Sequence, residues 1–147
     1  MNYINLLYKV GQTLKENLQD VTVRLTPWQA YAGQGYDKLT AGAVVLVNLG
    51  NVYLSHNTHS SESKIASLAI VETEVNIEIS IGKRNLRDED DFTVEEIVQN
   101  IEAILTSLDF DGCKLFLTTI SSGVIDDAMN YWRHLTFKLL SRNRIGV

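Results

Sequence analysis

The chain has 147 residues, of which 45% are hydrophobic and one is proline, so the composition excludes a disordered chain and favours one globular domain over residues 1–147. The formal net charge of -5 argues against a nucleic-acid-binding domain, since such domains usually carry a basic surplus. No apolar run approaches the ~20 residues of a membrane helix, and the N-terminus lacks the pattern of a signal peptide. The single cysteine, Cys113, excludes an internal disulfide and fits a reducing cytoplasm.

The first third of the chain predicts a helix and two strands. A helix of about four turns is indicated by apolar residues three and four positions apart, namely Tyr3, Leu7, Val10, Leu14 and Leu18. Residues 21–26 then alternate like a short strand that stops at Pro27. Residues 43–49 are a continuous apolar run, which predicts a strand covered on both faces. Gly50 and Asn51 predict a turn before a partner strand.

Residues 27–41 predict a loop, because aromatic residues and glycines occur there without helical or strand periodicity. Two interpretations remain open for its aromatic side chains. They fold back onto the core, or Trp28 and Tyr31 form part of a contact surface. A second polar loop is predicted at residues 55–64.

The centre of the chain predicts a long strand followed by an amphipathic helix. From Val71 to Ile81 apolar and polar residues alternate, as in a sheet with one dry face, and a bulge or bend is expected near Ile70. Gly82 is expected to open a charged turn. Thr93 and Glu96 have the spacing of a capping box, and the helix they start has one apolar stripe: Val94, Ile97, Val98, Ile101, Ile104, Leu105 and Leu108.

The last third predicts a turn at residues 109–112, a strand at 114–121 and a final strand at 130–142. The order helix, strands, helix, strands is not a strict strand–helix alternation. We therefore expect an α+β fold, with a mostly antiparallel sheet and two main helices packed on one face.

No arrangement of side chains in the sequence indicates catalysis. His56, His59 and Glu62 could ligate zinc only if a polar loop held them together, and no further ligands converge on them. Ser121 lacks a nucleophile elbow, and His134 lies inside a predicted strand. The acidic run at residues 88–91 does not match a calcium-binding loop. We expect no enzyme, no metal and no cofactor.

Charge is unevenly distributed along the chain. Residues 72–111 hold twelve acidic against three basic side chains, whereas residues 130–147 hold four basic and no acidic ones. These charges are either ordinary solvated surface or a two-signed surface suited to neighbours of the same kind. On the second interpretation the candidate subunit or partner contacts are charged side chains of the central turn and the C-terminal strand: Arg84, Arg87, Asp88, Asp90, Arg142 and Arg144.

Four segments of the second half together resemble a known family. They are V-N-I-E-I-S-I-G, D-D-F-T-V-E-E-I-V-Q-N-I-E-A-I-L, K-L-F-L-T-T-I-S-S-G and Y-W-R-H-L-T-F-K-L-L. Their order of strand, capped helix, strand and aromatic-bearing strand over residues 69–140 resembles the tail-terminator (tail-completion) proteins of contractile-tailed phages, in particular the Mu-like family found in prophages. The first half is similar only in layout.

The resemblance implies an α+β structural protein without catalytic residues. It implies a ring, commonly hexameric, that caps the head-proximal end of the tail tube, stops tube growth and prepares head joining. The implied partners are further copies of the chain, the tail tube protein and a head-completion or connector protein. The implied location is the bacterial host cytoplasm during assembly and then the virion tail. The alternative is a small non-catalytic binding or adaptor domain of the same layout.

Overall fold

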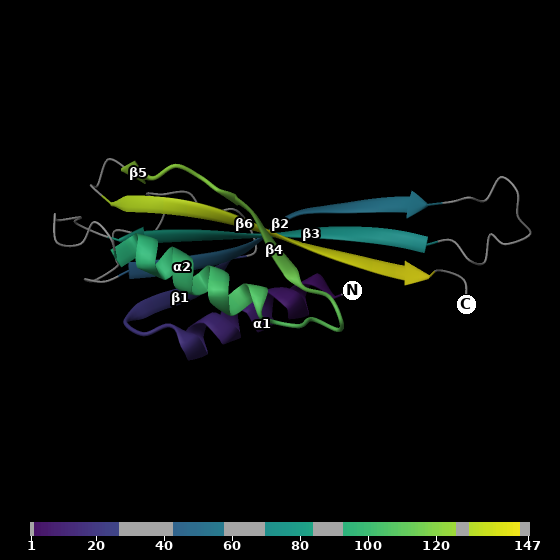
Figure 1. The fold of residues 1–147 in the computed structure, drawn as a ribbon, viewed down its shortest axis with the longest axis horizontal. Coiled ribbons are helices and arrows are strands. Elements are labelled where there is room, and N and C mark those ends of the chain that lie inside the picture. The colour runs from purple at the N-terminus through teal and green to yellow at the C-terminus, as the bar shows by residue number, and fades with distance from the viewer. Residues whose placement is uncertain (1, 27–42, 58–69, 84–92, 126–129, 145–147) are drawn as a thin grey trace, which may run out of the picture.

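The computed structural model describes residues 2–26, 43–57, 70–83, 93–125 and 130–144. These residues form two helices and six strands in chain order, shown in Figure 1. The elements are α1 (Tyr3–Asn17), β1 (Val21–Thr26), β2 (Ala43–Asn57), β3 (Ile70–Lys83), α2 (Thr93–Thr106), β4 (Leu115–Ile120), β5 (Val124–Ile125) and β6 (Tyr131–Arg144). The expected α+β class is confirmed.

The six strands form one sheet in the order β1-β2-β3-β6-β4, with β5 also pairing with β6. Only β1 and β2 are parallel, and the remaining pairs are antiparallel. The long strands β2, β3 and β6 lie next to one another in the middle of the sheet (Figure 1). The expected mostly antiparallel sheet is therefore confirmed.

Both helices pack on one face of this sheet, as expected, and each begins where the sequence pattern predicts. The side chain of Asn2 caps α1 by accepting a hydrogen bond from the backbone N–H of Asn5 at 3.1 Å. The stripe of α2 is buried at Val94, Ile97, Val98, Ile101 and Leu105. These side chains join residues of α1 and of β2, β3, β4 and β6 in one hydrophobic core. We call the opposite side of the sheet the open face.

The alternation predicted for β3 is confirmed. Val75, Ile77, Ile79 and Ile81 are each 0% exposed and point toward the helices. The first part of β2 is covered on both faces, as predicted. Val45 and Val47 lie in the main core, while a small cluster on the open face consists of Val44, Leu46 and Trp132.

Two glycines predicted to form or open turns lie inside strands, and the charged turn predicted after Gly82 lies mostly outside the described residues. Gly50 and Asn51 lie inside β2, which continues to Asn57 and includes the start of the loop predicted at residues 55–64. An irregularity in the pairing with β3 between Leu49 and Val52 accommodates them. Gly82 likewise lies inside β3 and pairs with Trp132 instead of opening a turn.

The predicted turn at residues 109–112 is confirmed. Asp111 and Gly112 have positive φ angles of 53° and 85°, and the backbone N–H of Gly112 donates to Asp109 Oδ1 at 2.7 Å. The strands predicted at 114–121 and 130–142 correspond to β4 and β6. The loop predicted at 27–41 and the segment before Ile70 lie outside the described residues.

Candidate assembly surface

Three strands extend past the rest of the fold at one end of the sheet. β1 pairs with β2 only up to Asn48, and β4 pairs with β6 only from Leu139 toward its start. Beyond these limits, within the described ranges, β2, β3 and β6 pair only with one another, and Figure 1 shows their ends reaching past both helices. We call residues 52–57, 70–75 and 139–144 the arm, at whose base Leu139 still pairs with Leu115 of β4.

Apolar side chains stand in solvent on the open face at the base of the arm. Tyr53 and Leu140 flank Glu74 from the two neighbouring strands and are 52% and 51% exposed. Phe116 pairs with Lys138 and is 55% exposed. Between them Lys138 Nζ lies 3.0 Å from a carboxylate oxygen of Glu74. Exposed apolar patches that include aromatic residues mark many protein contact surfaces.

Further along the open face, polar side chains pair across the strands beneath a shallow hollow of about 150 Å³. Ser80 Oγ lies 2.7 Å from His134 Nδ1, and Asn48 donates to Glu78 Oε2 at 3.0 Å. A serine nucleophile needs an imidazole base that a third group orients. Here Ser80 is only 5% exposed, and the nearby Glu78 carboxylate accepts from Asn48. The pair is therefore a contact between neighbouring strands, in which no described carboxylate is seen to orient His134.

The pH dependence of stability provides a test of how His134 is packed. Partial burial lowers its pKa below the ordinary 6.5, and the Glu78 carboxylate offsets this only in part. The unfolded chain therefore gains a proton at a higher pH than the folded chain, so this contribution to stability is complete above pH 6.5 and decreases as the pH falls toward the folded-state pKa. We expect the free energy of unfolding in urea to fall more between about pH 7.5 and about pH 5.5 in the wild type than in His134→Gln.

The variant serves as the control because it keeps a polar side chain and removes the titration. An equal loss of stability in both proteins would assign the pH response to other groups and contradict the packing of His134.

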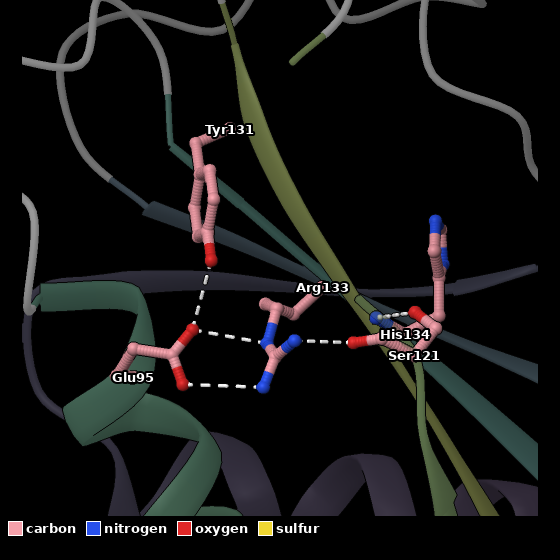
Figure 2. A network of polar contacts seen from close by, with 5 residues as sticks. All are labelled: Glu95, Ser121, Tyr131, Arg133 and His134. Atoms are coloured by element: carbon pink, nitrogen blue, oxygen red, sulfur yellow. Dashed lines mark hydrogen bonds and ion pairs between the residues drawn. The ribbon is translucent and has the colours of Figure 1, made fainter. Parts of the chain in front are cut away.

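A polar network at the other end of β6 joins α2 to the sheet edge (Figure 2). Glu95 of α2 accepts from the Tyr131 hydroxyl at 3.0 Å and pairs with Arg133, whose Nε lies 3.0 Å from Glu95 Oε1. Arg133 Nη1 also donates to the carbonyl of Ser121, whose Oγ accepts from the backbone N–H of His134 at 3.1 Å. Burial and the Glu95 carboxylate raise the pKa of Tyr131, so its hydroxyl stays protonated and donates. This network fixes the first turn of α2 to β6 and to the β4–β5 connection.

A hollow of about 180 Å³ lies beside α1 and the turn after α2. Lys9 Nζ there donates to the carbonyl of Asp109 at 2.9 Å and stands 4.9 Å from the centre of the Phe110 ring. Both contacts hold α1 against the turn. The lysine thus has a structural role in joining two segments distant in sequence.

Most of the contact residues predicted from the sequence lie outside the described residues: Trp28, Tyr31, Arg84, Arg87, Asp88 and Asp90. Arg142 and Arg144 lie at the end of β6, where their backbones pair with Glu72 and Ile70. Sequence reasoning missed Tyr53, Phe116 and Leu140. Their immediate sequence neighbours are mostly apolar, so only the pairing of strands shows which of these side chains lie on the open face.

The metal-ligand candidates are not tested as a set, because His59 and Glu62 lie outside the described residues. Elsewhere, the described ranges contain no group of three or more His, Cys, Asp or Glu residues that could hold a metal ion. Cys113 is a free, partly exposed thiol. Neither of the described helices is long and apolar enough to cross a membrane.

No protein-family model matches the chain, and the search of curated proteins finds no match.

Proposed function

We propose that this chain is a structural tail-assembly protein of a phage or prophage. Copies form a closed ring on the head-proximal end of the tail tube, end tube growth and prepare the joining of the head. The partners are further copies of the chain, the tail tube protein and a head-completion or connector protein, in the host cytoplasm during assembly and then in the virion tail. The proposal rests on the resemblance over residues 69–140 and on one structural observation, the projecting arm with its exposed apolar base.

The arm supports assembly because an isolated subunit leaves this surface in water. Three strands extend beyond the helices, with Tyr53, Phe116 and Leu140 each more than half exposed at their base. Association would remove such side chains from water, which is favourable by about 25 cal/mol for each Å² of apolar surface. Contact surfaces are commonly enriched in aromatic residues.

The positions of the two charged segments also support a ring. Lys83, the last described residue before the charged segment at positions 84–91, pairs with Tyr131 at one end of the sheet, while Arg142 and Arg144 lie at the other end of β6. At ~3.3 Å per residue these ends are roughly 40 Å apart. Unlike charges at opposite ends of a subunit favour head-to-tail contacts, and such contacts form a ring when the rotation closes.

The oligomeric state tests the proposal directly. We expect native mass spectrometry and negative-stain electron microscopy of the purified protein at low salt to show a closed ring, with six subunits as the number that the resemblance implies. Added during polymerisation of the tail tube protein, the ring should shorten the tubes, because it occupies their growing ends.

Two results would count against the proposal. A chain that stays monomeric at high concentration and low salt, and leaves tube length unchanged, would contradict it. A monomer that instead binds an unrelated partner would favour the alternative of a small binding or adaptor domain.

A further inference from the structure

We propose that neighbouring copies join by sheet extension: the free edge of β2 in the arm, residues 52–57, pairs antiparallel with β4, residues 115–120, of the next copy. This inference rests on the proposed ring and names the contact that closes it. The occupant of each edge is therefore a second copy of the chain.

Both edges lack a partner strand among the described residues. β2 pairs with β1 only over residues 43–48, so residues 52–57 have β3 on one side alone. β4 is the last strand of the sheet and pairs only with β6. Side chains along both edges are exposed, including Tyr53, Leu54 and Ser55 on β2 and Thr118 and Thr119 on β4.

Neither edge carries the residues that usually prevent strands from pairing. Monomeric proteins protect sheet edges with lysines, other charges, prolines, β-bulges or very short strands, and of these devices β4 shows only the irregularity between Leu117 and Thr119. The β2 edge reads V-Y-L-S-H-N and β4 reads L-F-L-T-T-I, with no acidic, lysine, arginine or proline residue in either. Each edge is six residues long, about 20 Å of backbone at ~3.3 Å per residue, and β4 departs from regular pairing between Leu117 and Thr119, so its regular part begins at Leu115.

The apolar side chains of the two edges also correspond face by face. Tyr53 and Phe116 point to the open face, because they pair with Glu74 and Lys138. Leu54 and Leu115 point to the helix side, because they pair with Thr73 and Leu139. In the antiparallel register that places Phe116 opposite Tyr53, Leu54 lies opposite Leu115, so an apolar pair forms on each face, the cross-strand contact that stabilises paired strands.

Charge favours the antiparallel direction. Lys114 precedes Phe116 by two residues, so it lies on the open-face side at the start of β4, and it is exposed. Glu72 and Glu74 lie on the open face of β3, next to the β2 edge, where Glu74 also pairs with Lys138 of its own chain. Antiparallel addition places Lys114 of one copy near these carboxylates of its neighbour, whereas parallel addition places it near Asn51. Because the two edges differ, the contact is head-to-tail and can close into a ring.

Disulfide trapping tests the contact in the full-length chain. In a Cys113→Ser background, we expect Phe116→Cys combined with Tyr53→Cys or with Ser55→Cys to give, on mild oxidation, a ladder of covalent oligomers on a non-reducing gel. Ser55 lies on the same face as Tyr53 and covers the register shifted by two residues. Within one chain, β3 and β6 separate β2 from β4, which puts positions 53 and 116 about 14 Å apart, beyond the ~7 Å limit for a disulfide.

Matched variants separate this inference from the ring itself. Tyr8→Cys with Phe116→Cys should give no ladder, because Tyr8 is 60% exposed but lies on α1. Tyr53→Lys and Thr118→Lys should each raise the subunit dissociation constant at least tenfold, with an unchanged circular dichroism spectrum, whereas Tyr8→Lys should leave it unchanged.

If rings form normally in both Tyr53→Lys and Thr118→Lys, the pairing of β2 with β4 is wrong, while the proposed function stands. The same holds if copies cross-link through Leu140→Cys, on the part of β6 that lies beyond β4, instead of through position 116. A wild-type chain that never forms rings would overturn both.

Discussion

Replacing Phe137 with alanine should lower the free energy of unfolding by about 3–5 kcal/mol, the range for deleting a buried aromatic ring. Phe137 is 0% exposed and pairs with Ile77 of β3 on one side and Leu117 of β4 on the other. It belongs to the core that both helices share with the sheet. Truncation there removes contacts from several elements at once and leaves a cavity that a paired central strand cannot collapse. Urea denaturation followed by circular dichroism measures the change.

Phe116→Ala is the matched control for this variant. The same residue type is deleted from the neighbouring strand, but the side chain is 55% exposed on the open face. In dilute protein, where subunit contacts do not contribute, its effect should stay within about 0.5 kcal/mol. A loss of less than about 1 kcal/mol in Phe137→Ala, or equal losses in the two variants, would contradict the assignment of the two faces of the sheet.

Periodicity predicted the elements well where one face alone is buried. The alternation of Val75, Ile77, Ile79 and Ile81 identifies β3, and the apolar stripe of α2 identifies the helix that covers it. Each pattern lies within about fifteen consecutive residues. Such local patterns require no knowledge of which strands pair.

The two glycines that were predicted at turns but lie inside strands show where local patterns are insufficient. Glycine beside asparagine is a common turn signal, yet Gly50 lies inside β2, where a side chain would come 3.1 Å from the backbone oxygen of Asn76. Position 82 of β3 is a glycine because the indole of Trp132, fifty residues later, occupies the space that a side chain would need. The reason for each glycine lies on another strand, so no window around it reveals the role.

The candidate assembly surface could not be predicted from the sequence for the same reason. Tyr53, Phe116 and Leu140 come from three strands. They lie on the same face of the sheet only because of the strand order and register, which no local pattern reveals. The length of the arm depends on β2 continuing through Gly50. The two-signed surface stays a prediction, because the charged segment at positions 84–91 lies outside the described residues, although Arg142 and Arg144 lie at the end of β6 opposite Lys83.

Replacing Gly82 with alanine should cost about 3 kcal/mol, the upper end for overpacking a well-filled site. A Cβ at this position would lie 2.3 Å from Trp132 Cζ3, far inside van der Waals contact. The indole is 2% exposed and packs with Val44 and Leu46 across the glycine, so it has little room to move aside. The same measurement of urea denaturation gives the change.

A double-mutant cycle with Trp132→Val shows whether the indole is the cause. Valine suits a strand and has no atoms beyond Cγ, so it removes the clash while keeping a β-branched residue opposite position 82. In this background Gly82→Ala should be neutral or stabilising by up to about 1 kcal/mol, since glycine inside a strand costs that much relative to alanine. The effect of one substitution thus changes sign with a residue on another strand. If Gly82→Ala remained as costly in the valine background, a conformational requirement of the β3 backbone would explain the glycine instead of the covering indole.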